Sequence, residues 1–287
     1  MKLKRELYLW LAGRLGLEAW PPGHFYSALP ILGAQVSADP ARDLPAPGLD
    51  IDLQAMRRYV GRMTDQAEAI AQVFSSGAYF IRDNPFFSGL DAVALVHAMQ
   101  VHRPARVVEI GGGHSTALML DTIDVLELQS LMTCVEPYPD RLSKLRRHGR
   151  LTVKQQPVES LDWSVFESLG AGDILFVDSS HVVKSGSDVL YLILHVLPRV
   201  PVGVLVHFHD IYLPDDYPLE WRRERRAWNE SYFLHAFLMH NQDFEIVFTS
   251  HIAAREFPAD LAALGQALGS AWTGGGSFWI RRIRASP

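Results

Sequence analysis

Short apolar runs alternate with helical stretches from Ala105 to the end of the chain, and this alternation restricts the fold more than any other feature. Strands separated by helices imply parallel neighbours joined by crossover helices. Runs that are apolar at consecutive positions are typical of strands buried on both faces. We therefore expect a doubly wound α/β fold with seven mostly parallel strands, the last two forming a closing hairpin-like pair. The runs are RVVEI, LMTCVEP, LTVKQ, DILFVDSS, VGVLVHFHD, FEIVFTS and SFWIRRI.

The first third of the chain has a different texture. A helix with Leu7, Trp10 and Leu11 on one face is expected near the N-terminus. Residues 21–50 are rich in proline and glycine, which interrupt helices and strands. A helical pattern then runs over residues 51–100. We expect residues 1–100 to form a helical and irregular lid that also binds the acceptor, and residues 101–287 to form the sheet domain.

Composition and charge limit the class of protein. The formal net charge of -5 argues against a nucleic-acid binder, which usually carries a basic excess. The single cysteine, Cys134, cannot form an internal disulfide, so a cytoplasmic location is expected. No window approaches the roughly 18 apolar residues of a membrane-spanning helix. The sequence leaves a homodimer open.

The segment VVEIGGGHST, residues 107–116, carries the sharpest motif. A strand should end at Ile110, a tight turn should follow at Gly111–Gly113, and a helix should begin near Ser115 and Thr116. Glycines allow the backbone to approach a ligand closely, and a helix N-terminus offers free N–H groups. Glu109, at the end of the strand, precedes the glycines directly. We therefore expect a nucleotide-type ligand at this turn.

Two cofactor classes could occupy this turn, namely a dinucleotide and a cofactor that contains a single nucleoside. The dinucleotide pattern G-x-G-x-x-G, started at Gly111, requires a small residue at position 116, where Thr116 stands. Glu136 follows the next strand at a spacing that suits an acid binding ribose hydroxyls. Both cofactor classes use such an acid, so Glu136 supports a nucleoside without choosing between them.

Polar side chains also follow the next two strands. Asp178 ends one buried run, with His181 three residues later, and His209 and Asp210 end the following run. The carboxyl ends of parallel strands line the ligand crevice of an open sheet. Carboxylates and imidazoles together suit a divalent metal such as Mg²⁺, Mn²⁺ or Fe²⁺. The segment HFHD also invites comparison with metallohydrolases, but it lacks their H-x-H-x-D-H spacing.

From Val107 to Ile283 the chain resembles bacterial class I methyltransferases of the Methyltransf_24 type, through DSSHVVKSGSD, VHFHDIYLPDDYP, RAWNESYFLHAFLMHN and the upstream GHFYSALP. The resemblance implies a Rossmann-like fold and S-adenosyl-L-methionine (SAM) as cofactor. It implies that Asp178 is a catalytic residue and metal ligand, that Asp210 is a ligand, and that His181 is the base. This chain has His209 where relatives carry a carboxylate, and we count His209 among the metal ligands. The expected cofactor-binding residues are Glu109, Gly111, Gly113, Ser115, Thr116, Glu136, Val158 and Glu159.

The acceptor is expected to meet segments outside the sheet. GHFYS and RAWNESYF supply the candidates, which are His24, Tyr26, Trp228, Asn229 and Tyr232. We expect a SAM-dependent methyltransferase acting on a hydroxyl of a small molecule, with a divalent metal at Asp178, His209 and Asp210. A metal-independent N-methyltransferase and a non-catalytic SAM-binding scaffold stay open as alternatives.

Overall fold

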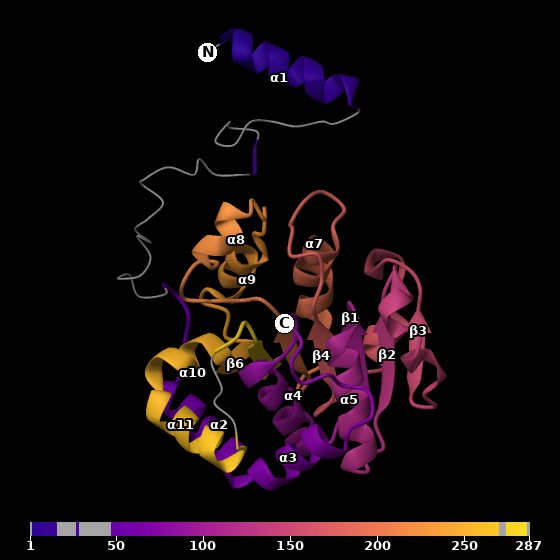
Figure 1. The fold of residues 1–287 in the computed structure, drawn as a ribbon, viewed down its shortest axis with the longest axis vertical. Coiled ribbons are helices and arrows are strands. Elements are labelled where there is room, and N and C mark those ends of the chain that lie inside the picture. Colours follow the sequence, from indigo (N-terminus) through magenta and orange to yellow (C-terminus); the bar gives the residue numbers. More distant parts are fainter. Residues whose placement is uncertain (1, 16–26, 29–46, 270–273, 286–287) are drawn as a thin grey trace. The chain divides into compact units, whose positions relative to one another are not determined.

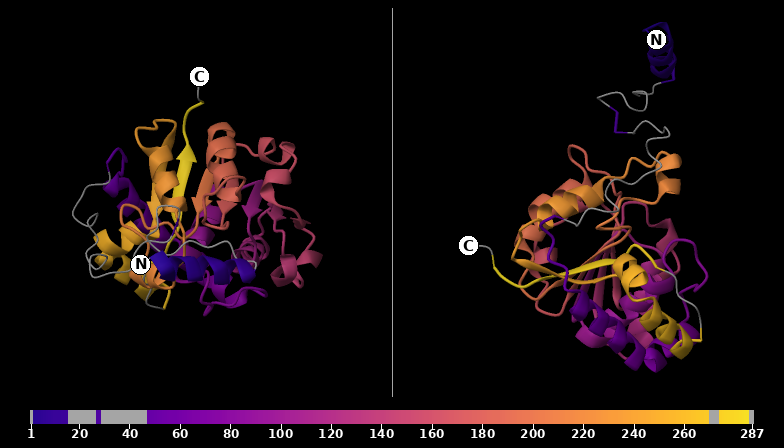
Figure 2. Two further views of the ribbon diagram at one scale, coloured as in Figure 1. Left: turned by 90° about the horizontal axis from the view of Figure 1, so that it is seen from above. Right: turned by 90° about the vertical axis from the view of Figure 1, so that its left-hand side faces the viewer.

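The computed structural model describes residues 2–15, 27–28, 47–269 and 274–285, and a seven-stranded sheet forms its centre (Figures 1 and 2). The strand order is β3-β2-β1-β4-β5-β7-β6. Strand β7 is antiparallel to both of its neighbours, and every other pairing is parallel. This confirms the predicted fold class. The strands are β1 (Arg106–Ile110), β2 (Leu131–Val135), β3 (Leu151–Lys154), β4 (Ile174–Val177), β5 (Leu205–Phe208), β6 (Phe244–Thr249) and β7 (Phe278–Arg282).

The register of the three central strands positions the functional site. Ile110 at the end of β1 pairs with Val177 at the end of β4, and Val177 pairs with Phe208 at the end of β5. All residues of β4 and β5 are buried, as their unbroken apolar pattern predicts. Because the three strands end level with one another, the segments that follow them emerge side by side at one edge of the sheet.

The last two strands form the expected antiparallel pair. They are not joined by a tight turn, because helices α10 (Ser250–Glu256) and α11 (Pro258–Ala267) lie between them in the chain. Strand β7 inserts between β5 and β6, so it carries the reversal of direction into the sheet. Its start, at Phe278, therefore lies opposite Phe208 and close to the edge where the parallel strands end.

Helices cover both faces of the sheet, and two hydrophobic cores result. One core includes side chains from α2 (Leu53–Asp65), α3 (Ala67–Ser76), α4 (Gly89–His102), α5 (His114–Val125), η2 (Pro139–Leu142), η3 (Leu145–Arg147), α10 and α11. The other includes side chains from η4 (Val158–Ser160), α6 (Ser164–Glu167), α7 (Asp188–Tyr191), η5 (Leu192–Val196), η6 (Leu197–Arg199) and α9 (Glu230–Leu238).

Helix α4 is deeply buried in the first core. Its residues from Leu90 to Met99 are all buried, including Asp91 and His97. A helix that is apolar around its whole circumference belongs inside a fold rather than on its surface. Helices α2, α3 and α4 thus share a core with the sheet, and the expected division of the chain at residue 100 stays a prediction.

Residues 46–213 and 229–287 form one compact unit, and residues 1–45 and 214–228 form another. The second unit contains α1 (Lys2–Arg14), helical as expected, and α8 (Leu219–Arg223). Within it the guanidinium of Arg226 lies 4.6 Å from the ring centroid of Trp221 and 4.8 Å from that of Trp228. In the described part of the chain, we find no helix with the length and apolar character needed to cross a membrane.

Candidate active site

The glycine turn after β1 is packed against the end of β4. Gly111 has φ +80°, a conformation that favours glycine. A Cβ atom at this position would overlap the carbonyl oxygen of Asp178. The backbone N–H of Asp178 also donates to the carbonyl of Ile110, at 2.8 Å. The glycine therefore allows the turn and the strand end carrying Asp178 to meet in backbone contact.

Glu109 is buried beneath this turn and binds the start of α5. Its carboxylate accepts hydrogen bonds from the hydroxyls of Ser115 (2.7 Å) and Thr116 (2.6 Å). Burial raises the pKa of Glu109 to about 7, although these two hydroxyls oppose the shift. The Thr116 hydroxyl in turn accepts from the N–H of Gly113, at 3.0 Å. These four predicted cofactor residues are thus bonded to one another, and their visible contribution is to hold the loop in shape.

Glu136 follows β2 and faces the same turn. One carboxylate oxygen accepts from the N–H of Gly112 (3.2 Å), and the other accepts from the N–H of Tyr138 (2.7 Å). The carboxylate is therefore fixed beside the glycines by backbone donors. This is the arrangement expected of an acid that binds ribose hydroxyls next to a glycine-rich turn.

A pocket of about 440 Å³ opens at this edge of the sheet. Five predicted site residues line it, namely Gly111, Glu136, Val158, Glu159 and Asp178. The lining combines apolar Val135, Pro157 and Val158 with acidic side chains that include Glu136 and Glu159, which suits a ligand that carries both a flat ring and hydroxyl groups. The volume lies in the range typical of small-molecule sites, so the pocket fits a nucleoside-containing cofactor.

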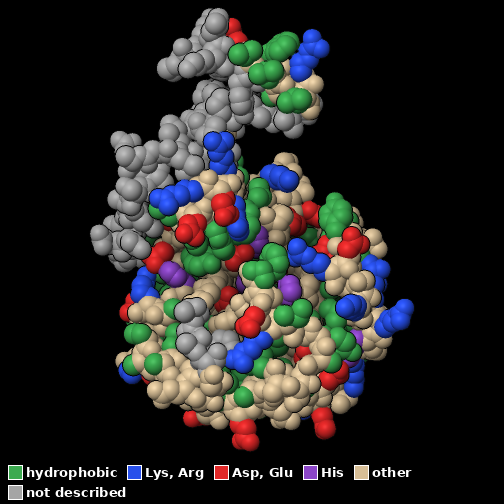
Figure 3. Space-filling model, in the orientation of Figure 1, with side chains coloured by type: hydrophobic (Ala, Val, Ile, Leu, Met, Phe, Trp, Pro, Cys, Tyr) green, Lys and Arg blue, Asp and Glu red, His purple; other side chains and the backbone are tan. Residues whose placement is uncertain are grey.

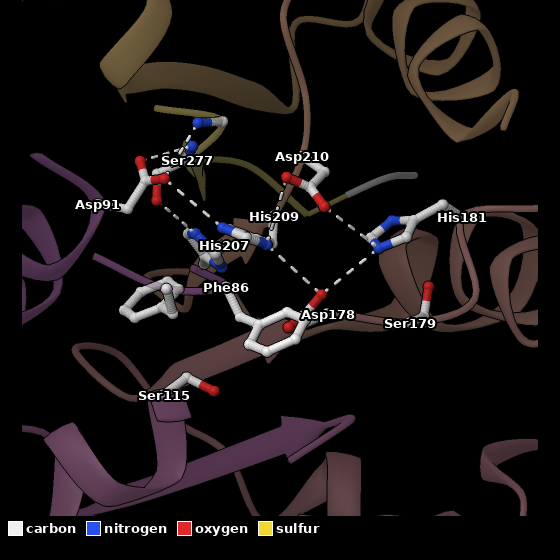
Figure 4. A network of polar contacts seen from close by, with 12 residues as sticks. Phe86, Asp91, Ser115, Asp178, Ser179, His181, His207, His209, Asp210 and Ser277 are labelled. Atoms are coloured by element: carbon white, nitrogen blue, oxygen red, sulfur yellow. Dashed lines mark hydrogen bonds and ion pairs between the residues drawn. The ribbon is translucent and has the colours of Figure 1, made fainter. Parts of the chain in front are cut away.

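The predicted side chains after β4 and β5 come together in a single cluster (Figure 4). His181 Nε2 lies 3.5 Å from Asp178 Oδ1 and 3.7 Å from Asp210 Oδ2. His209 Nδ1 lies 3.5 Å from Asp178 Oδ1 and 3.6 Å from Asp210 Oδ1. The two carboxylates are thus flanked by two imidazoles. Both His181 (φ 59°) and Asp210 (φ 58°) adopt left-handed backbone conformations, which are uncommon outside glycine and concentrate at functional sites.

Two buried acids that were not predicted from the sequence complete the cluster. Asp91 of α4 lies 3.5 Å from His209 Nε2, and its oxygens accept from the N–H groups of Gly276 (3.0 Å) and Ser277 (2.9 Å). Glu230, the first residue of α9, lies 2.8 Å from His181 Nδ1. Asp91 could have been noticed in the sequence, since it is a lone acid in the apolar stretch of α4. Glu230 could not, because an acid at the start of a helix is ordinary.

A second glycine run also touches the site and was not anticipated. A Cβ atom on Gly276 would lie 2.7 Å from Asp210 Cα, and the N–H of Ile211 donates to the Gly276 carbonyl at 2.9 Å. The segment TGGGSF before β7 was the available signal. It allows the start of β7 to pass directly over Asp210.

The cluster concentrates charge in a buried place. Burial would lower the pKa of His181, but Asp178 and Glu230 outweigh it and raise the pKa to about 10. Burial is likewise outweighed at His209, where Asp178 and Asp210 raise the pKa well above the ordinary value. Burial would raise the pKa of Asp178, but His209 and His181 hold it below its ordinary value. Near neutral pH, both imidazoles are therefore charged when the carboxylates are their only ionic partners.

The donor atoms also suit a metal. Ligand atoms of Asp178, His181 and Asp210 all lie within 4.8 Å of one another. His209 presents a second imidazole to the same two carboxylates. Two carboxylates with an imidazole form a donor set that divalent cations such as Mn²⁺ and Fe²⁺ accept. The residues present therefore fit the expected metal.

Of the expected acceptor-binding residues, Asn229 and Tyr232 belong to the same compact unit as the cluster. The Asn229 side chain accepts from the N–H of Val183 at 2.6 Å, and the Asn229 N–H donates to the His181 carbonyl at 3.0 Å. Tyr232 on α9 is half exposed. Trp228 belongs to the separate unit with Trp221, and His24 and Tyr26 lie outside the described residues. On the face shown in Figure 3, acidic and basic side chains are interspersed.

Taken together, the strand order and the pocket at the carboxyl ends of β1, β2 and β4 define a Rossmann-like α/β domain. Within it, residues 108–211 match the family model Methyltransf_24, described as a methyltransferase domain. The matched residues run from β1 through the end of β5, so they include the glycine turn, Asp178, His181, His209 and Asp210.

Several known proteins are similar to this chain at low sequence identity. An uncharacterised protein of Archaeoglobus fulgidus is 27% identical over 167 residues, which cover 53% of this chain and 74% of that protein. The SAH-bound methyltransferase PaMTH1 of Podospora anserina superposes with a TM-score of 0.45 at 15% identity, covering 82% of this chain and 98% of that one. The O-methyltransferase TomG of Streptomyces achromogenes, in complex with SAM, gives 0.41 at 12% identity, covering 76% and 89%.

Proposed function

We propose that the protein transfers a methyl group from SAM to a hydroxyl of a small molecule, assisted by a divalent metal. The observation that carries the proposal is the junction between pocket and cluster: Asp178 lines the pocket and also lies 3.5 Å from both imidazoles. A cofactor in the pocket would therefore lie beside groups able to handle a proton. An acceptor hydroxyl needs such groups, because it must lose its proton when it attacks.

The cofactor site would be formed by the turn at Gly111 and by the loops after β2 and β3. Glu136 would bind the ribose hydroxyls, and Val158 with Glu159 would close the pocket around the nucleobase of the cofactor. Glu109, Ser115 and Thr116 would hold the glycine turn in shape from beneath. The N–H of Gly113 donates to the Thr116 hydroxyl. When bound, SAM supplies a methyl group already activated by its sulfonium, so the protein needs mainly to orient the acceptor in line with the methyl–sulfur bond.

His181 would take the proton of the acceptor. The cofactor would supply the methyl group and keep the electrons of its carbon–sulfur bond on sulfur, so that neutral S-adenosylhomocysteine (SAH) would be its product. The acceptor O–H proton moves to Nε2 of His181. Because the neighbouring carboxylates hold the pKa of His181 near 10, the imidazole must first become neutral.

Asp178, Asp210 and His209 would hold the metal. A divalent cation there supplies positive charge that offsets the carboxylates and lowers the pKa of a nearby hydroxyl. Asp91 lies behind His209, as a carboxylate commonly does behind a metal-binding imidazole. His209 would thus be held with Nδ1 toward the two aspartates.

Thermal unfolding with SAH, with NAD⁺ and without ligand, each with and without Mn²⁺ or Mg²⁺, tests the proposal. SAH at about 100 times its dissociation constant should add roughly 2.7 kcal/mol of stability. A further upward shift with Mn²⁺ that disappears in Asp178→Asn, while the SAH shift remains, would support the metal site. A shift with NAD⁺ but none with SAH would contradict SAM dependence. Acceptors can then be sought by measuring SAH release from SAM with a panel of small hydroxyl compounds.

A further inference from the structure

Glu230 is a buried carboxylate whose charged neighbour is an imidazole. Its side chain is 1% exposed. Oε2 lies 2.8 Å from His181 Nδ1, and Oε1 accepts from the Ser179 hydroxyl at 3.3 Å. Among the residues that the structure describes, no Lys or Arg forms an ion pair with Glu230. A carboxylate buried in this way is costly unless its bonds compensate, so its partners indicate its role.

The contact with Glu230 distinguishes the two nitrogens of His181. Nδ1 faces Glu230 at 2.8 Å, whereas Nε2 faces Asp178 at 3.5 Å and Asp210 at 3.7 Å. A carboxylate can only accept at Nδ1, so it keeps a proton on that nitrogen. Nε2 then lies on the side of the two aspartates (Figure 4).

The start of α9 also holds the backbone of His181. The His181 carbonyl accepts from the N–H groups of Asn229 (3.0 Å) and Glu230 (3.3 Å). These bonds fix a residue whose φ of 59° is otherwise uncommon for histidine. Glu230 therefore bonds to both the backbone and the ring of His181, and Asn229 bonds to the backbone.

We propose that Glu230 is a positioning residue, which holds the imidazole of His181 through an Nδ1–H bond and thereby directs Nε2 toward Asp178 and Asp210. The role rests on the proposed function, in which Nε2 receives the acceptor proton. Asp91 stands behind His209 in a comparable place, but its distance to Nε2 is longer, at 3.5 Å, and its oxygens also accept from the N–H groups of Gly276 and Ser277.

The ring nitrogens of His181 report on this arrangement without an acceptor. We would record two-bond ¹⁵N–¹H spectra of the full chain labelled in histidine and saturated with SAH, and assign His181 from the signals lost in His181→Gln. In the wild type, Nδ1 should carry a strongly deshielded, slowly exchanging proton. Glu230→Met, which removes the acceptor at similar volume, should abolish that resonance. Glu230→Gln, which retains an acceptor oxygen, should restore it in part.

Asp173→Asn is the matched control. Asp173 is also buried, and it accepts from the N–H groups of Arg106 (2.8 Å) and Gly170 (2.8 Å), away from the cluster. This variant should lose stability and leave the His181 signals unchanged. Identical His181 signals in the wild type and in Glu230→Met would overturn the positioning role. If Glu230→Met does not fold, a wild-type spectrum with the slowly exchanging proton on Nε2 instead of Nδ1 overturns it equally.

The same samples separate this inference from the proposed function. SAH-induced stabilisation of the wild type tests SAM dependence, and the ring spectrum tests the role of Glu230. Absence of the SAH effect with the expected spectrum would contradict the function and leave the positioning of the ring supported. The reverse result would contradict the positioning alone.

Discussion

The two imidazoles of the cluster face the same pair of aspartates but are held in different ways. His209 lies between β5 and the glycine run before β7, behind it stands Asp91, and its ring lies 5.2 Å from that of Phe87. His181 lies in a loop with a left-handed backbone, and Glu230 of α9 orients its ring. Asp91 is tied to the backbone of residues 276 and 277, whereas Glu230 is tied to side chains.

The electrostatics follow the same division. Burial would raise the pKa of Asp91, but bonding to His209 and to backbone donors lowers it to about 2. Burial raises the pKa of Glu230, and its bond to His181 only opposes the shift. A charged acid bonded to backbone donors suits the support of a metal ligand, and an acid bonded to the ring of a proposed base suits the positioning of that base. We call His181 with Glu230 the His181 half of the cluster, and His209 with Asp91 the His209 half. We expect the removal of each imidazole to affect a different property of the protein.

Breaking the His181 half should produce the largest effect, and it should fall on turnover. His181→Gln removes the proton acceptor, and loss of such a group typically costs about 10²- to 10⁴-fold in rate. SAH binding should be retained, because His181 does not line the pocket. The measurement is the rate of SAH release together with the SAH-induced shift in Tm. His195→Gln, at an exposed histidine of η5, is the control that should behave as wild type.

Breaking the His209 half should act on stability first. His209→Gln leaves Asp91 and Asp178 without their shared imidazole, and loss of one partner of a buried ion pair costs about 3–5 kcal/mol. Urea unfolding at pH 7 would measure the change in free energy. The double variant Asp91→Asn with His209→Gln should recover part of the loss. A greater loss of stability in His181→Gln than in His209→Gln would contradict the assignment of the stabilising role to His209.

Glu109 extends the comparison to a buried acid with no imidazole beside it. Its folded-state pKa of about 7 exceeds the ordinary 4.5, so the folded protein holds the proton more tightly. The stabilising contribution is complete below pH 4.5 and is lost as the pH rises through about 7. Glu109→Gln should resemble the wild type at pH 5 and be more stable than it at pH 8.5, by roughly 3 kcal/mol. Parallel unfolding curves at both pH values, with an unchanged difference, would contradict this.

Gly276 tests the backbone support of the His209 half with the smallest change. In Gly276→Ala the new methyl group would lie 2.7 Å from Asp210 Cα and 2.9 Å from Asp210 N, so the backbone must shift. Overpacking of this kind typically costs about 1–3 kcal/mol. Gly61→Ala is the matched control, because a Cβ at this helical position meets nothing within 4 Å. That variant should be stabilised by roughly 0.5–1 kcal/mol, and chemical denaturation of both variants would show the contrast.

The sequence predicts the side chains at the strand ends better than the two buried acids behind them. Asp178, His181, His209 and Asp210 each follow an apolar run, and the rule that parallel strands end at one edge brings them together. Asp91 and Glu230 come from helices distant in the sequence, and only the packing of α4 and α9 brings them to the imidazoles. The strands and the helices α2 to α4 could be predicted because hydrophobic periodicity indicates which residues are buried. Periodicity does not identify the residues that those buried side chains contact.

The left-handed backbone at His181 and Asp210 has a practical consequence. Asparagine tolerates that conformation better than most residues, so His181→Asn and Asp210→Asn remove reactive groups without adding backbone strain. The double variant should remain folded and should still bind SAM in its pocket, while methyl transfer fails. Such a protein is suited to retain its second substrate from a cell extract long enough for the compound to be identified by mass spectrometry.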